Sequence, residues 1–129
     1  MYQIRKGWPS DHALDETVKA EVGATVTEGM IAALSDGYAK PAEEDDELVS
    51  FIIGAEPMTG TLTALLGGFI VEVDDAHYVP GSYAAKDKLY AAAGKFTKTA
   101  TGTSPVVIGQ VLRVITSGTE TKLRILWRA

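Results

Sequence analysis

Three side chains of the 129-residue chain have types and a spacing that could support acid–base or metal chemistry. Asp74 and Asp75 end an apolar run, and His77 follows two residues later. A carboxylate beside an imidazole can move protons, and the same groups can hold a divalent cation. The only other histidine is His12, and no further ligand has a convincing spacing. The pattern therefore favours an ordinary strand end over a catalytic or metal site.

Residues 43–47 are a second candidate, because all five are carboxylates. Carboxylate oxygens suit Ca²⁺, but a loop of the EF-hand type alternates its ligands and has a central glycine for the sharp turn. The run has neither feature. We interpret it as a solvated loop that leads into the apolar segment Leu48–Ile53, a predicted buried strand that closes at Gly54.

The rest of the composition excludes several kinds of chemistry. The chain has no cysteine, so disulfides, thiolate zinc ligands and cysteine nucleophiles are all ruled out. No apolar run approaches the ~20 residues that a membrane-spanning helix needs. The first six residues lack the apolar core of a signal peptide. We expect no catalytic residues, no metal, no cofactor and no association with a membrane.

Charge is distributed unevenly along the chain. The net charge of −5 argues against nucleic-acid binding, which depends on accumulated lysine and arginine. Residues 1–85 carry 4 basic and 15 acidic side chains, a net charge of −11, whereas residues 86–129 carry 8 basic and 2 acidic ones, a net charge of +6. Complementary potentials of this kind could orient one copy against another. The alternative is that both sets of charges only solvate outer strand faces.

Turn signals between short apolar runs predict β-structure. Asp36-Gly37 separates the apolar run 29–34 from residues 38–41, and Asp-Gly between two such runs is a good hairpin signal because glycine supplies the positive φ of the turn. Residues 69–73 alternate in the manner of a half-buried strand. The length is that of one domain. We therefore predict an all-β fold, a small β-sandwich or barrel.

The last third of the chain has the clearest pattern. Residues 88–92 and 95–98 are predicted to be paired strands around a turn at Ala93-Gly94, and Val106–Thr116 has apolar residues on both faces, as expected of a central strand. The final strand alternates, with Leu123, Ile125 and Trp127 on one face and Lys122, Arg124 and Arg128 on the other. This alternation predicts a C-terminus that is part of the sheet.

We divide the chain into an extended N-terminal arm, residues 1–21, and a single β domain, residues 22–129. The start of the arm has no helical or strand periodicity, and Pro9 favours an extended conformation in the residue before it. We also expect short irregular or helical inserts, and the secondary structure of two segments stays open. Asp11–Val22 fits an amphipathic helix or a strand, and Met58–Leu66 fits a helix or an irregular loop.

A series of short phrases runs along residues 22–128 in the order Glu28-Gly29, Asp36-Gly37, Asp87-Lys88-Leu89-Tyr90, Gly94-Lys95-Phe96-Thr97, Pro105-Val-Val-Ile and a closing Leu-Arg-Ile strand. The most telling phrase is Gly109-Gln-Val-Leu112, which follows a loop rich in threonine and glycine. In this order of turns and strands, residues 22–128 resemble the head-decoration, or capsid cement, proteins of tailed bacteriophages. Residues 43–47 and 55–67 have no counterpart in that pattern.

The resemblance implies a fold, a function and a set of partners. Its fold is a small β-sandwich or barrel of the β-tulip kind. Its function is that of a structural virion protein, made in the host cytoplasm, that binds the outer surface of the capsid and bridges major capsid subunits. Such proteins are often homotrimers. Repeated weak contacts supply their affinity, so no active site is required.

The N-terminal arm is the segment expected to reach a neighbouring subunit. An extended segment can add a strand to the open edge of another sheet. We predict that Tyr2, Ile4, Trp8 and Pro9 contact the capsid or another subunit. The alternative is that Trp8 covers one end of its own barrel.

Two other classes of function stay open. Another phage structural component, such as a tail tube, a head–tail connector or a fibre base, would share the β composition and the acidity. A small-ligand binding module or an enzyme would need His77 and the pair Asp74-Asp75 to converge in one cleft, with shifted pKa values.

Overall fold

The computed structural model describes residues 2–6 and 15–128 of the chain. Within these ranges the protein is all-β, as predicted, and none of its segments is a helix that could span a membrane. The strands in chain order are β1 (Tyr2–Lys6), β2 (Asp15–Ala20), β3 (Ile31–Ser35), β4 (Tyr38–Pro41), β5 (Val49–Glu56), β6 (Thr61–Leu65), β7 (Phe69–Val73), β8 (Lys88–Ala92), β9 (Lys95–Thr97), β10 (Gly109–Ser117) and β11 (Glu120–Trp127).

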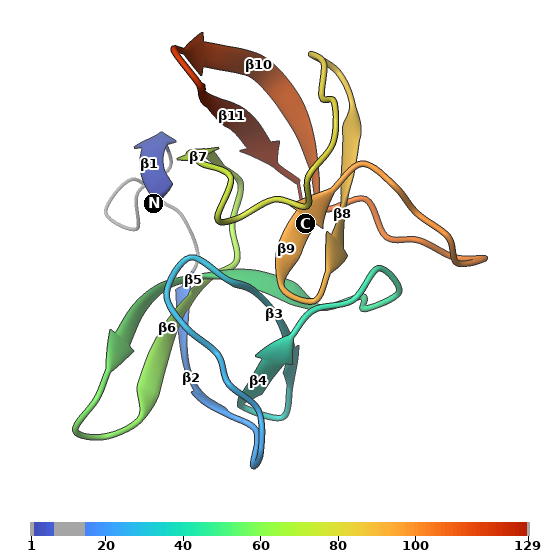
Figure 1. Cartoon of the computed structure of the whole chain (residues 1–129). Helices are drawn as coiled ribbons and strands as arrows, with labels where there is room; N and C mark the ends of the chain where they lie inside the picture. The colour runs from blue at the N-terminus through green and yellow to red at the C-terminus, as the bar shows by residue number, and fades with distance from the viewer. Residues whose placement is uncertain (1, 7–14, 129) are drawn as a thin grey trace.

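The strands form two units that lie one above the other in Figure 1. Strands β2, β4, β3, β5 and β6 pair in that order as a small closed barrel, at the bottom of the view. The other six strands form a sheet in the order β1-β7-β11-β10-β8-β9, at the top. The fold is a small β-barrel with a second sheet, which is consistent with the predicted small β-sandwich or barrel.

The main hydrophobic core joins the two units. Phe51 of the barrel strand β5 packs among Phe69, Phe96 and Trp127 of the sheet, with ring centroids 5.9 to 6.2 Å apart. All four side chains are at most 2% exposed. Aromatic side chains bury the most apolar area per residue, so this cluster is a large part of what holds the sheet against the barrel.

The Asp-Gly turn is present where the sequence predicted it. Asp36 and Gly37 connect β3 to β4, and both have positive φ, 50° and 80°. This is the geometry of a type I′ turn, whose twist matches that of the flanking strands. Ala93 and Gly94 repeat it between β8 and β9, with φ of 48° and 82°. The predicted strands around this turn are therefore confirmed.

Both segments that the sequence left open contain strands. Residues 15–20 of the Asp11–Val22 segment form β2, and residues 61–65 of the Met58–Leu66 segment form β6, which pairs with it. Neither is a helix, because each buries one face in the barrel as a strand. The predicted end of a strand at Gly54 is wrong, since β5 continues to Glu56 through an irregularity in its register at Ile53.

The predicted N-terminal arm contributes strands to both units. Strand β1 pairs with β7 at one end of the six-stranded sheet, and β2 lies in the barrel between β4 and β6. The division into an arm, residues 1–21, and a domain, residues 22–129, stays a prediction. Residues 7–14, which include Trp8, Pro9 and His12, lie outside the described residues.

Candidate protein-docking surface

Strands β10 and β11 form a hairpin that is longer than the sheet around it (Figure 1). The two strands pair from Gly109–Trp127 to Ser117–Glu120. Strand β7 pairs with β11 only from Leu123 onward, and β8 pairs with β10 only at Gly109 and Gln110. The end of the hairpin therefore extends past its neighbours in the sheet.

The turn of this hairpin sets the direction of its backbone groups. Gly118, with a φ of 64°, is the first of the two turn residues, as in a type II′ turn. A turn of this kind is closed by a hydrogen-bonded pair, here Ser117 and Glu120, and hydrogen-bonded and non-hydrogen-bonded pairs then alternate along the ladder. The N–H groups of Val114 and Thr116 consequently point away from β11.

The outer edge of β10 from Arg113 to Ser117 is open. No strand among the described residues pairs with it on the side opposite β11. An unpaired row of N–H and C=O groups is a template for a strand from another chain. Proteins that avoid such pairing keep their edge strands short or irregular. This edge has one irregularity, at Leu112, before a regular run of five residues.

Apolar side chains accompany the open edge. Leu112 is 40% exposed and Val114 is 37% exposed. The sequence predicted a central strand for Val106–Thr116 because its apolar residues occupy both faces. That prediction is wrong for the second half of the segment, which lies at an edge with apolar side chains in solvent. Exposed apolar residues beside an unpaired strand are typical of a surface that binds another protein.

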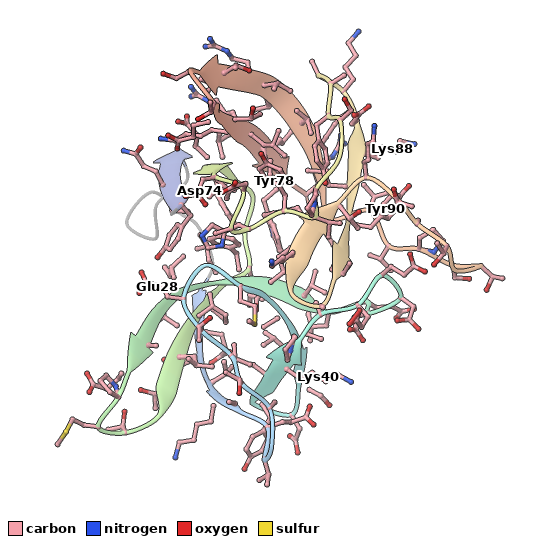
Figure 2. All side chains as sticks on the ribbon, in the orientation of Figure 1. Glu28, Lys40, Asp74, Tyr78, Lys88 and Tyr90 are labelled. Atoms are coloured by element: carbon pink, nitrogen blue, oxygen red, sulfur yellow. The ribbon has the colours of Figure 1, made fainter. Side chains whose placement is uncertain are left out.

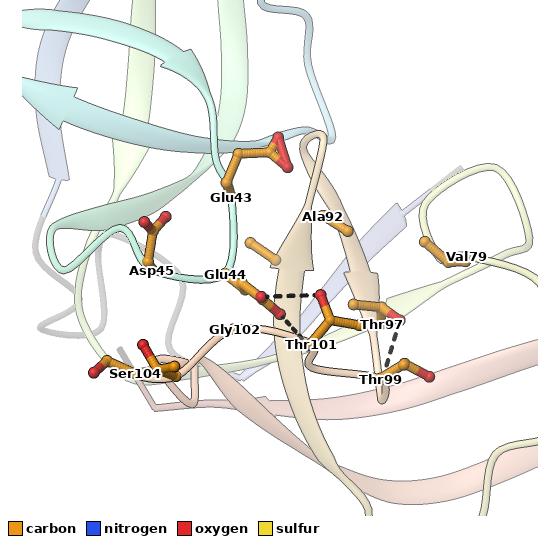
Figure 3. Close-up of a pocket in the computed structure, with 12 residues that line it drawn as sticks. Glu43, Glu44, Asp45, Val79, Ala92, Thr97, Thr99, Thr101, Gly102 and Ser104 are labelled. Carbon is orange, nitrogen blue, oxygen red and sulfur yellow. Dashed lines mark hydrogen bonds between the residues drawn. The ribbon is translucent and has the colours of Figure 1, made fainter.

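The acidic run 43–47 borders a cleft of about 620 Å³ that Figure 3 shows. The carboxylate of Glu43 accepts the N–H of Ala93, with oxygens 3.0 and 3.2 Å from the nitrogen. The carboxylate of Glu44 accepts the N–H of Thr101 at 2.9 Å and its hydroxyl at 3.3 Å. These bonds tie the barrel loop to the turn after β8 and to the loop after β9.

The expectation of a solvated acidic loop holds for only part of the run. The carboxylates of Glu43 and Glu44 accept hydrogen bonds from other parts of the fold, and the Asp46 carboxylate accepts the N–H of Glu43 at 2.8 Å. Asp45 and Glu47 are exposed, and neither has a hydrogen bond or an ion pair with any described residue. Across the part of the chain that the structure describes, no three histidine, aspartate or glutamate side chains are grouped so as to hold a metal ion.

His77 and Asp74 lie together, as their spacing suggested. His77 Nε2 is 4.0 Å from Asp74 Oδ1, while Asp75 is exposed (Asp74 is labelled in Figure 2). Burial lowers the pKa of the His77 imidazole, and the nearby Asp74 opposes that shift. The imidazole also packs on the backbone of Gly29 and near the ring of Tyr2, at a centroid distance of 6.2 Å. Its contacts join the loop after β7 to the loop before β3.

Tyr2 and Ile4 pack against the core of their own molecule. The Tyr2 ring meets Phe51 edge-on at 5.2 Å, and its hydroxyl lies at hydrogen-bonding distance from the Glu28 carboxylate and 3.0 Å from the Ile53 carbonyl oxygen. Burial and the neighbouring Glu28 raise the pKa of Tyr2. Ile4 is partly buried. A role for these two residues, or for Trp8 and Pro9 outside the described ranges, in contacts with other subunits stays a prediction.

The open edge of β10 was not found from the sequence. The alternation in the last strand showed which side chains face outward, but it carried no information on how far β7 and β8 extend along the hairpin. The only local signal was that the apolar residues Leu112 and Val114 flank the charged Arg113 in the sequence.

The chain was compared with models of known protein families and with the sequences of curated proteins. It is similar enough to neither for a match, so these comparisons assign it no family and no function.

Proposed function

We propose that the protein is a structural component of a tailed-phage particle that binds the outer surface of the capsid and bridges major capsid subunits. The open edge of β10 is the observation that carries the proposal. It is a regular run of five residues in which Val114 and Thr116 offer outward main-chain hydrogen bonds, and Leu112 and Val114 lie beside it for apolar contact. The resemblance of residues 22–128 to capsid cement proteins supplies the partner.

Bridging requires two separate contacts, and the edge of β1 is a second place in the six-stranded sheet where a strand can be added. Strand β1 ends the sheet on one side and pairs only with β7 among the described residues. The outer edge of β10 is separated from β1 by the two strands β7 and β11. A capsid subunit on each edge would be linked through the ladder β1-β7-β11-β10. Contacts by the predicted arm residues Tyr2 and Ile4 would use the β1 edge.

The chemistry of such a contact needs no catalytic group. A strand that pairs along Arg113–Ser117 gains backbone hydrogen bonds, each with a net value of about 0.5–1.5 kcal/mol. One contact of this length is weak, since part of that energy offsets the loss of translational freedom. Many copies on a symmetric shell raise the total affinity without any new contact. A protein in this role therefore binds an assembled shell far more tightly than an isolated capsid subunit.

The experiment that tests the proposal is co-sedimentation of the purified protein with empty, expanded capsids of tailed phages that have lost their own decoration protein. We expect saturation at a fixed ratio of this protein to capsid subunit, and no comparable binding to unassembled subunits. Absence of binding to any such shell, or binding without saturation, would contradict the proposal. Assembly of the protein alone into tubes or rings would favour a tail-tube or connector role instead.

A further inference from the structure

A basic hollow of about 340 Å³ lies where β8, β10 and the end of β11 meet. It is lined by Lys88, Val107, Gln110 and Arg128. Strand pairing fixes these positions, because Gln110 is opposite Lys88 in one ladder and the Arg128 N–H donates to the Ile108 carbonyl at 2.8 Å. The hollow is separate from the open edge of β10, which begins three residues after Gln110.

Arg128 of this hollow is oriented by a hydrogen bond, and no carboxylate of the described residues pairs with Arg128 or Lys88. Arg128 Nη1 donates to Gln110 Oε1 at 3.0 Å, and Gln110 Nε2 donates to the Lys86 carbonyl at 3.0 Å. These two hydrogen bonds orient the guanidinium of Arg128, and its other N–H donors have no partner among the described residues. Lys88 is exposed, and none of the described residues that line the hollow is acidic. A fixed guanidinium beside an ammonium group is suited to a carboxylate.

The hollow also has an apolar part. Val107 is 37% exposed there. The complementary group would be a pair of carboxylates next to an apolar side chain. The end of the acidic run offers these chemical types on one exposed loop, where Glu47 and Leu48 line the same small hollow and Asp45 borders the neighbouring cleft. Both carboxylates are exposed without partners among the described residues, and Leu48 is 58% exposed.

The same complementarity holds for the two halves of the molecule. Residues 15–65, which contain the barrel, have eleven acidic and two basic side chains, a net charge of −9. Residues 66–128, which contain most of the sheet, have five acidic and eight basic ones, a net charge of +3. Two copies in which a barrel faces a sheet attract each other, whereas two barrels repel.

We propose that the hollow of Lys88 and Arg128 binds the carboxylates of Asp45 and Glu47 from a second copy of this chain, with Leu48 against Val107. The contact joins unlike surfaces, so it can close a ring of copies or form a reciprocal pair. It involves rim charges exposed to solvent and is therefore weak and sensitive to salt in solution. It does not depend on the capsid proposal, because none of its residues lies on the open edge of β10.

Charge reversal tests this contact. One double variant, Lys88→Glu with Arg128→Glu, reverses the hollow, and another, Asp45→Lys with Glu47→Lys, reverses the loop. Sedimentation velocity over a concentration series at low ionic strength should show self-association of the wild type. Each variant alone should have a dissociation constant at least tenfold larger. An equimolar mixture of the two should associate again, since their reversed surfaces are complementary.

A matched control keeps the result specific. Lys95→Glu with Lys98→Glu makes the same change in net charge on exposed positions away from the hollow, and it should self-associate like the wild type. Circular dichroism checks that all variants are folded. A wild type that stays monomeric at every concentration, variants that associate normally, or a mixture that fails to recover would overturn the proposal. Capsid binding of the same variants separates this contact from the β10 edge.

Discussion

His77 packs so closely on Gly29 that a Cβ atom on Gly29 would lie 2.5 Å from Cε1 of the imidazole. Gly29 has a φ of +88° and precedes β3 of the barrel, while His77 follows β7 of the sheet. The glycine N–H also donates to the Ile52 carbonyl at 2.7 Å. This contact and the aromatic cluster around Phe51 fix the sheet on the barrel, and thus set where the β10 edge lies.

Gly29→Ala should destabilise the protein more than an alanine at an unobstructed glycine. Gly23 is the matched control, since its φ is +85° and a Cβ there would meet nothing within 4 Å. The strain of positive φ costs roughly 1–2 kcal/mol at either position. The clash with His77 adds about 1–3 kcal/mol at Gly29 only. Urea unfolding measures both free energies, and equal losses at the two sites would contradict the packing described here.

The stability of the protein should fall on acidification through the titration of His77. Burial lowers the pKa of this imidazole below its usual 6.5, so the unfolded chain binds the proton more readily than the folded one. The contribution of His77 is therefore complete above pH 6.5 and is lost as the pH falls through the folded-state pKa. Asp74 faces the ring and opposes the shift, and Lys95 reinforces it.

His77→Gln removes this titration. Chemical unfolding at a series of pH values should show a smaller loss of stability between pH 7 and pH 5 for the variant than for the wild type. An identical pH dependence would show that the imidazole is not desolvated by its contacts with Gly29 and Tyr2.

Glu44 should control the order of the threonine-rich loop. Its carboxylate accepts the N–H of Thr101, and its backbone carbonyl accepts the N–H of Val106 at 2.7 Å. Glu44→Ala removes the first bond and keeps the second. Hydrogen exchange at the Thr101 amide should accelerate by tenfold or more, since the loop then opens without its charged acceptor. Asp45→Ala, at a carboxylate with no partner in the described ranges, should leave that rate unchanged.

The sequence predicted local structure better than the relations between distant segments. Asp36-Gly37 and Ala93-Gly94 are turns because short-range sterics select them, and Leu123, Ile125 and Trp127 are buried because alternation marks one face of a strand. The Met58–Leu66 segment stayed open since propensity alone does not separate a short helix from a strand that pairs with β2.

The open edge of β10 and the basic hollow were harder to predict, because both depend on how distant segments pack. The open edge of β10 exists because β8 ends its pairing at Gln110 and β7 starts its pairing at Leu123, and both limits are set by tertiary packing. The basic hollow depends on Lys88 and Arg128, which are forty residues apart and meet only through two ladders. A local pattern of apolar residues sets the face that a strand buries, but not which distant strand it pairs with.

The most direct test of the docking edge is a single proline in β10. Thr116→Pro removes an N–H that points away from β11, so it blocks an added strand. The hairpin bonds of the adjacent residues to Lys122 and Glu120 are kept. Thr116→Val is the control, because it keeps the N–H and has a similar shape. Binding to expanded empty capsids should fall at least tenfold for the proline variant and stay within twofold of wild type for the valine variant. Equal binding by the two folded variants would contradict a docking role for this edge.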